Sequence, residues 1–127
     1  MAQAMVHLVD DDAGVRGTLA RLVASGGYGV TVYASGRELL DAADALDGGY
    51  ILLDVDMPGA DGFAVHRALT ERSIKVPVVL MTGSGDLTVL ALKAGVADFL
   101  QKPFGRAELL SVLDHLAVPC GAEASLG

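Results

Sequence analysis

The sequence has no tryptophan, a single cysteine (Cys120), four prolines and only 5% aromatic residues. One cysteine cannot form an internal disulfide or a cysteine metal cluster, so the composition predicts a cytoplasmic protein in a reducing compartment. Basic residues are also few, because nine Lys and Arg stand against sixteen Asp and Glu, for a net charge of −7. This charge opposes broad electrostatic attraction to nucleic acid or anionic lipid, so we expect this chain to bind neither directly.

Long apolar runs are missing as well. No stretch approaches the ~20 residues that span a bilayer, and no basic region precedes an apolar one near Met1, so we expect neither export nor a membrane span. With 127 residues, 52% hydrophobic and 20% charged, the composition is typical of one globular domain. We predict a domain over residues 1–118 and a tail or linker over 119–127.

Short apolar segments alternate along the chain with segments of helical spacing. The predicted strands are Met5 to Val9, Tyr28 to Tyr33, Tyr50 to Asp54, Val76 to Thr82, and Ala97 to Leu100. A helix is predicted after each of them. Uninterrupted apolar strands that alternate with helices are typical of a parallel sheet covered on both faces. The sequence therefore predicts an α/β fold, a doubly wound sheet of five parallel strands with five helices, in a single domain.

Several helix ends carry local signals. Ser35 and Glu38 form a capping box, in which each side chain accepts a hydrogen bond from a free backbone amide of the other end of the box. Asp12 and Asp61 are predicted N-caps. Gly48 and its neighbouring glycine are predicted to end the second helix, because glycine tolerates the left-handed conformation that follows a helix.

Polar side chains follow the carboxyl ends of four predicted strands, and these ends line one edge of an open parallel sheet. The residues are Asp10, Asp11 and Asp12 after the first strand, Asp54 at the third, Thr82 at the fourth and Lys102 after the fifth. Converging carboxylates repel one another unless a cation compensates, and oxygen ligands suit Mg²⁺. A carboxylate also accepts phosphoryl groups, whose oxygens a Lys and a hydroxyl can bind. The pattern predicts a Mg²⁺-dependent phosphoryl site.

At these positions the sequence resembles receiver domains of two-component response regulators, over about Val6 to Leu116. The motifs that carry the resemblance are Val-Asp-Asp-Asp at 9–12, Asp-Val-Asp-Met-Pro-Gly at 54–59, Met-Thr-Gly at 81–83 and Lys-Pro-Phe at 102–104. The residues of these motifs are most similar to those in receivers of nitrogen-fixation transcription regulators. The resemblance implies a flavodoxin-like fold and a phosphoryl group transferred from a sensor histidine kinase, with no chemistry beyond the domain's own phosphorylation and dephosphorylation.

The resemblance also implies the roles of the acidic residues. Asp54 is the implied phosphoacceptor. Asp11 and Asp54 are the implied direct Mg²⁺ ligands, together with the backbone carbonyl of Asp56, and Asp10 is implied to act through a water molecule.

A switch is implied by the remaining motifs. Thr82 corresponds to the hydroxyl that turns toward the phosphoryl group, Lys102 to its charge partner, and Phe99 to the aromatic ring whose rotamer follows. The bond between Lys102 and Pro103 is implied to be cis. The surface formed by the fourth helix, fifth strand and fifth helix is the expected contact for an output partner or a second copy.

Each of these residues also has a simpler interpretation. Asp10 or Asp11 alone could cap a helix, Thr82 alone could bond to backbone, and Lys102 alone could be a surface charge. Lys102 follows Thr82 by only 20 positions, about two fewer than the resemblance implies, and the shortfall falls in or before the fourth helix.

Three other functions stay open at this point. A receiver-like interaction module that takes no phosphate is the first, and a small phosphatase acting through an aspartyl phosphate is the second. A nucleotide or flavin binder is the third, but it would carry Gly, Ser or Thr donors where Asp10 to Asp12 stand. A transcriptional role would need another domain or partner, because no DNA-reading helix or basic face is present.

Asp56 gives a first testable prediction. Its extra carboxylate beside the acceptor is expected to favour the metal and disfavour the phosphoryl group by like-charge repulsion. The Asp56→Asn variant should therefore dephosphorylate at a different rate from the wild type, measured as the loss of the acyl phosphate with time. Equal rates in the two proteins would contradict this expectation.

Overall fold

The computed structural model describes residues 5–46, 48–55, 62–74, 76–83 and 96–117. Five parallel strands form a sheet in the order β2–β1–β3–β4–β5. The strands are β1 (Met5–Val9), β2 (Gly29–Tyr33), β3 (Tyr50–Asp54), β4 (Val78–Thr82) and β5 (Asp98–Gln101). The predicted parallel sheet is confirmed.

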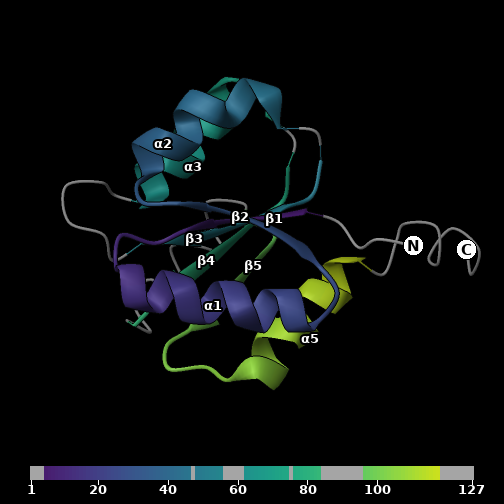
Figure 1. The fold of residues 1–127 in the computed structure, drawn as a ribbon. Coiled ribbons are helices and arrows are strands. Elements are labelled where there is room, and N and C mark those ends of the chain that lie inside the picture. The colour runs from purple at the N-terminus through teal and green to yellow at the C-terminus, as the bar shows by residue number, and fades with distance from the viewer. Residues whose placement is uncertain (1–4, 47, 56–61, 75, 84–95, 118–127) are drawn as a thin grey trace, which may run out of the picture.

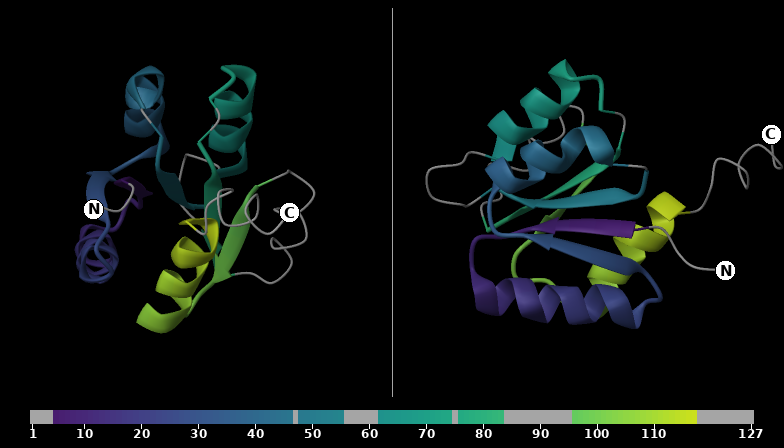
Figure 2. Two further views of the ribbon diagram at one scale, coloured as in Figure 1. Left: turned by 90° about the vertical axis from the view of Figure 1, so that its right-hand side faces the viewer. Right: turned by 45° about the horizontal axis from the view of Figure 1, so that its top comes forward.

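Helices cover both faces of this sheet, as Figures 1 and 2 show. On one face lie α1 (Ala13–Ser25) and α5 (Arg106–Ala117), and on the other lie α2 (Gly36–Ala42), its short 3₁₀ extension η1 (Ala43–Ala45) and α3 (Gly62–Glu71). The fourth predicted helix falls within residues 84–95, outside the described residues. None of the described helices is long and apolar enough to cross a lipid bilayer.

The core consists of two apolar clusters, one on each side of the sheet. β1 serves both, because its successive side chains point to opposite faces. Val6 and Leu8 pack with α1 and α5. Val9 packs with α2 and α3 in the second cluster, called the α2–α3 cluster below, and all three side chains are fully buried. The central strands are buried on both faces, which is why their sequence pattern is continuous rather than alternating. The edge strand β2 is more open, with Val32 46% exposed.

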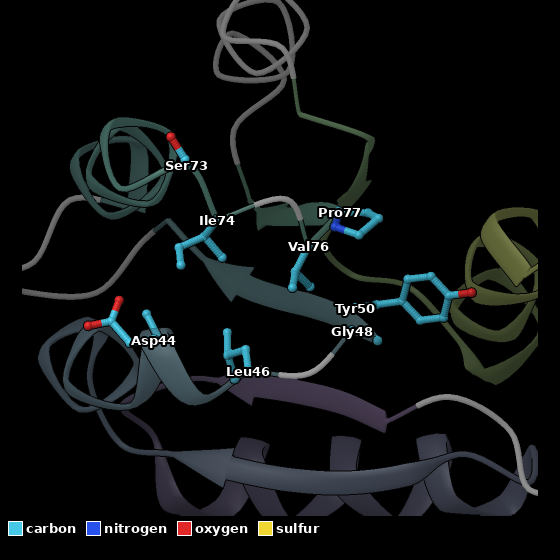
Figure 3. A pocket seen from close by; sticks show the side chains of 10 residues that line it. Asp44, Leu46, Gly48, Tyr50, Ser73, Ile74, Val76 and Pro77 are labelled. Carbon is cyan, nitrogen blue, oxygen red and sulfur yellow. The ribbon is translucent and has the colours of Figure 1, made fainter.

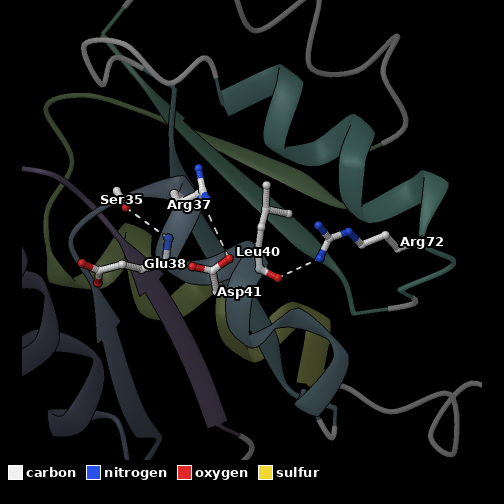
Figure 4. Close-up of polar contacts among 6 residues, drawn as sticks. All are labelled: Ser35, Arg37, Glu38, Leu40, Asp41 and Arg72. Atoms are coloured by element: carbon white, nitrogen blue, oxygen red, sulfur yellow. Dashed lines mark hydrogen bonds and ion pairs between the residues drawn. The ribbon is translucent and has the colours of Figure 1, made fainter.

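The helix starts follow the predicted capping chemistry. The Val15 amide donates a 3.0 Å hydrogen bond to the Asp12 side chain at the start of α1. At α2 the Glu38 amide donates to Ser35 Oγ at 3.1 Å (Figure 4). Glu38 Oε1 accepts in return from the Ala34 amide at 2.9 Å, one residue before the position expected for a capping box. The predicted cap at Asp61 lies outside the described residues.

Some predicted boundaries were wrong. The second helix ends at Ala45, before the glycine pair, because Leu46 turns to an extended conformation and packs against the α2–α3 cluster. β4 begins at Val78 rather than Val76, since Pro77 has no amide to donate to the ladder. The last helix runs from Arg106 to Ala117.

The helices are also tied to one another by polar contacts. Arg72 Nη1, just after α3, donates to the Leu40 carbonyl of α2 at 2.8 Å (Figure 4). On the opposite face, Tyr28 donates to Asp114 Oδ1 of α5 at 2.6 Å. This contact ties the C-terminal part of α5 to the start of β2.

The amino ends of β3 and β4 border a cavity of about 390 Å³ (Figure 3). Gly48 and Gly49 lie on its wall with φ of +90° and +89°, a region that side chains with a Cβ rarely adopt. A Cβ at Gly49 would also strike the carbonyl oxygen of Met5, whereas one at Gly48 would meet nothing within 4 Å. Gly49 therefore permits the close approach of the chain to β1.

These glycines form a matched pair for a stability test. Gly49→Ala is expected to lower the free energy of unfolding by about 2 to 4 kcal/mol, because positive φ and the collision with Met5 both oppose folding. Gly48→Ala has the same backbone strain without the collision and should lose only about 1 to 2 kcal/mol. Urea unfolding followed by circular dichroism measures both. Equal losses of stability in the two variants would show that the Met5 carbonyl can move away from the new Cβ without an energetic penalty.

Candidate functional site

The candidate site lies where the strand order reverses. From β1 the chain passes to β2 on one side and later returns to β3 on the other, and the carboxyl ends of strands at such a reversal are where open α/β sheets bind ligands. Asp10 and Asp11 follow β1, and Asp54 is the last residue of β3. Carboxylate oxygens of these three residues lie within 4.8 Å of one another. The structure thus brings the predicted acidic residues together.

Asp10 is the most constrained of the three. Only 1% of the residue is exposed, and its Oδ1 accepts a 2.9 Å hydrogen bond from the Asp12 amide. Its Oδ2 is buried and accepts no hydrogen bond from the described residues. Burial raises the pKa of Asp10, and the charges of Asp54 and Asp11 add to this, against the Asp12 hydrogen bond and Lys102. A buried carboxylate oxygen without a donor is costly and needs a compensating group.

A hard divalent cation fits this arrangement. Mg²⁺ binds carboxylate oxygens at about 2.1 Å, and three carboxylate oxygens within 4.8 Å of one another are close enough for small side-chain movements to bring them onto one ion. The unpartnered oxygen of Asp10 supplies an independent reason, because a cation or its water would satisfy it. The acidic pocket could therefore hold Mg²⁺. The predicted fourth contributor, the carbonyl of Asp56, lies outside the described residues.

Lys102 and Thr82 complete the site from the neighbouring strands. Lys102 Nζ lies 3.1 Å from Asp54 Oδ1, and the Asp54 side chain is 4% exposed. The Lys102 amide donates a 2.7 Å hydrogen bond to the Thr82 carbonyl, which links the ends of β5 and β4 directly. Thr82 itself is buried. The Lys102 ammonium thus borders the carboxylate of Asp54, and Thr82 is joined to Lys102 through the backbone.

The remaining predicted features are found further from the carboxylates. Phe99 lies on β5 opposite Leu80 and packs, partly buried, against the α2–α3 cluster. The peptide bond between Lys102 and Pro103 is cis, as the resemblance implies. The cavity at the amino ends of the strands lies at the opposite edge of the sheet, and Asp44 is the one carboxylate among the described residues that line it.

Sequence reasoning missed one residue at this site. Arg16 Nη1 donates a 2.8 Å hydrogen bond to the backbone carbonyl of Asp10, which stands six positions earlier. The sequence carried no specific signal for this contact, because the spacing of Asp12 and Arg16 points to the Asp12 side chain and not to the carbonyl of Asp10.

The sequence and fold of this chain were compared with those of known proteins. The model of the response regulator receiver domain matches residues 6–114. The chain belongs to this family. The receiver domain is 44% identical over 124 residues to the transcriptional regulatory protein FixJ of Azorhizobium caulinodans, with 96% of this chain and 54% of that protein covered. It is 40% identical over 114 residues to the tetrathionate response regulatory protein TtrR of Salmonella typhimurium, with 88% and 55% covered.

Solved structures agree with this assignment. The receiver domain matches the crystal structure of FixJ-N with a TM-score of 0.84 at 32% identity, covering 90% of this chain and 93% of that one. Chemotaxis protein CheY4 of Vibrio cholerae matches with a TM-score of 0.81 at 30% identity, covering 91% and 99%. The predicted family and fold are confirmed. The chain spans about half the length of the FixJ and TtrR proteins that it matches.

Asp10 gives a prediction for this receiver domain. Asp10→Asn should raise the free energy of unfolding without divalent ions by about 1 to 3 kcal/mol, because it removes a buried charge beside two other carboxylates and supplies an amide N–H that can donate to them. The same variant should lose any stabilisation by Mg²⁺.

The matched control is Asp12→Asn, which removes the same charge at an exposed cap that Asn fills equally well. This variant should resemble the wild type, both without metal and with Mg²⁺. Thermal unfolding with and without Mg²⁺ compares the three proteins. A metal-free Asp10→Asn protein less stable than the wild type would contradict the prediction.

Proposed function

We propose that this receiver domain accepts a phosphoryl group on Asp54 from a sensor histidine kinase, with Mg²⁺ as cofactor, and thereby switches the surface around β5 and α5. The observation that supports this most is the setting of Asp54. Its carboxylate lies within 4.8 Å of the acidic pair Asp10 and Asp11 on one side and 3.1 Å from Lys102 on the other. A nearly buried carboxylate between an anionic and a cationic group is suited to take up a phosphoryl group.

In the proposed reaction an Asp54 oxygen attacks the phosphorus of a phosphohistidine. A bond between oxygen and phosphorus forms, the phosphorus–nitrogen bond breaks, and the imidazole of the donor leaves with the electron pair. Such transfers depend mainly on positioning and on stabilisation of charge on the phosphoryl oxygens. Lys102, already 3.1 Å from the attacking carboxylate, would bind one of those oxygens, and the Thr82 hydroxyl another.

Mg²⁺ would supply positive charge to the carboxylates and to the transferred phosphoryl group. In the proposed ligand set Asp11 and Asp54 bind the ion directly with the backbone carbonyl of Asp56, and Asp10 binds it through water. The buried position of Asp10 and its hydrogen bond from the Asp12 amide support this assignment, because they hold the carboxylate behind the more exposed Asp11.

Phosphorylation would act on the sheet edge through charge. It adds about −1.5 to −2 of charge at neutral pH, which attracts the Lys102 ammonium and the Thr82 hydroxyl. Because the Lys102 amide is bonded to the Thr82 carbonyl, the ends of β4 and β5 would respond together. Phe99, two residues before the end of β5, would then change its packing, as the switch role implies.

The output surface proposed for this switch includes the described β5 and α5. A hollow of about 440 Å³ lies there, lined by Phe99, Leu100, Gln101, Ala107, Glu108, Ser111 and Val112. This surface would contact an output domain, a separate partner or a second copy. FixJ and TtrR are named as regulatory proteins roughly twice as long as this chain, which supports an output domain as one such partner.

The proposal is tested by incubating the domain with acetyl phosphate and Mg²⁺ and measuring intact mass. We expect the mass of one added phosphoryl group in the presence of Mg²⁺. No group should be added when Mg²⁺ is chelated before the reaction. Asp54→Asn should give no adduct because it lacks the nucleophile. The matched control Asp12→Asn removes one acidic charge nearby and should still be labelled.

The outcomes separate the alternatives. A folded wild-type protein that acquires no phosphoryl group would overturn the proposal in favour of a receiver-like interaction module. Labelling that persists in Asp54→Asn would place the acceptor elsewhere. Multiple turnovers of phosphate monoesters unrelated to phosphohistidine would favour a phosphatase instead.

A further inference from the structure

Arg16 is the residue near the site that the proposed reaction does not use. It lies in the first turn of α1, where its amide donates to the Asp12 carbonyl at 2.8 Å. Its side chain folds back toward the sheet, and Nη1 donates a 2.8 Å hydrogen bond to the carbonyl of Asp10. The guanidinium therefore binds a backbone carbonyl of the acidic cluster, that of Asp10.

The carbonyl that Arg16 holds has a particular place in the chain. The Asp10 amide still pairs with β2, donating to the Tyr33 carbonyl at 3.2 Å. The Asp10 carbonyl lies beyond the last residue of β1, in a residue that is 1% exposed. A buried backbone carbonyl requires a donor, and here a charged guanidinium provides one.

This hydrogen bond controls the direction of the next residue. The carbonyl of Asp10 and the amide of Asp11 belong to one rigid planar peptide group. Fixing the carbonyl therefore fixes the path of the chain into Asp11. The Asp12 amide holds Asp10 Oδ1 in a similar way. Neither contact involves Asp10 Oδ2, which accepts no hydrogen bond from the described residues.

We infer that Arg16 is a positioning residue for the divalent-cation site, which holds the peptide between Asp10 and Asp11 so that both carboxylates face the ion. The inference rests on the proposed function, because it requires the acidic cluster to bind Mg²⁺. Arg16 acts through its hydrogen bond to the backbone, and its charge alone is not sufficient.

The test measures Mg²⁺ binding by calorimetry in the unphosphorylated domain. Arg16→Met removes the donors and the charge but keeps a similar aliphatic stem, and it should raise the Mg²⁺ dissociation constant about tenfold, as the loss of an outer contact to a metal site does. Arg21→Met is the matched control, since Arg21 is exposed on the same helix and loses the same charge. It should bind Mg²⁺ like the wild type. Arg16→Lys keeps a charged donor group, and its Mg²⁺ dissociation constant should lie between those of the wild type and Arg16→Met.

A kinetic readout separates positioning from a general loss of structure. In labelling by acetyl phosphate, the Mg²⁺ concentration for half-maximal rate should rise in Arg16→Met by the same factor as the dissociation constant. The rate at saturating Mg²⁺ should change much less, because Asp54 and Lys102 are untouched. If Arg16→Met does not fold, Mg²⁺ binding is compared between Arg16→Lys and Arg21→Lys instead. Weaker Mg²⁺ binding is expected only in Arg16→Lys.

Two results would overturn the inference while leaving the proposed function in place. One is a dissociation constant for Arg16→Met within twofold of the wild type, and the other is equal weakening in Arg16→Met and Arg21→Met, which would indicate charge alone. A wild-type domain that binds no Mg²⁺ would instead overturn the proposed function, and this inference with it.

Discussion

The mutual repulsion of Asp10, Asp11 and Asp54 is the constraint around which this domain is arranged. Three carboxylates within 4.8 Å raise one another's free energy unless positive groups or donors compensate. The described structure supplies part of the compensation through Lys102, 3.1 Å from Asp54, and through the Asp12 amide on Asp10. One buried oxygen of Asp10 receives none from the described residues. A cation would therefore stabilise the site, and a change in charge at Asp54 would alter this balance.

Holding such a cluster together requires a rigid support, and the parallel sheet provides it. β1 and β3 are buried on both faces by two apolar clusters, so the strand ends that carry the carboxylates cannot move apart without opening the core. Lys102 and Thr82 are joined by a backbone hydrogen bond at the neighbouring strand ends. The acidic side of the site is thus fixed by the core, while the Lys102 side is linked to β5 and α5, through which the proposed switch would act.

Much of the fold followed from local pattern. The five strands, the caps at Asp12 and Ser35 and the family motifs were all predicted, because continuous apolar runs and capping residues depend on neighbours in the sequence. The wrong start of β4 has a local cause, the missing amide of Pro77, whereas the end of the second helix has a tertiary one. The second helix stops before its glycines because Leu46 is drawn into the core, and Gly49 serves a close approach to Met5 instead of a helix end. Arg16 was missed because its partner is a carbonyl, and every residue has a carbonyl.

The sequence by itself determined which groups stand at the ends of the strands, since strand period and family motifs place Asp10, Asp11, Asp54, Thr82 and Lys102 without reference to three-dimensional contacts. Only the tertiary structure decided how far these groups are compensated. The 3.1 Å approach of Lys102 to Asp54, the unpartnered oxygen of Asp10 and the Arg16 hydrogen bond depend on how β1, β3 and β5 are ordered in the sheet and how α1 packs on it. Electrostatic energy depends on distance and burial, and neither is encoded by spacing along the chain.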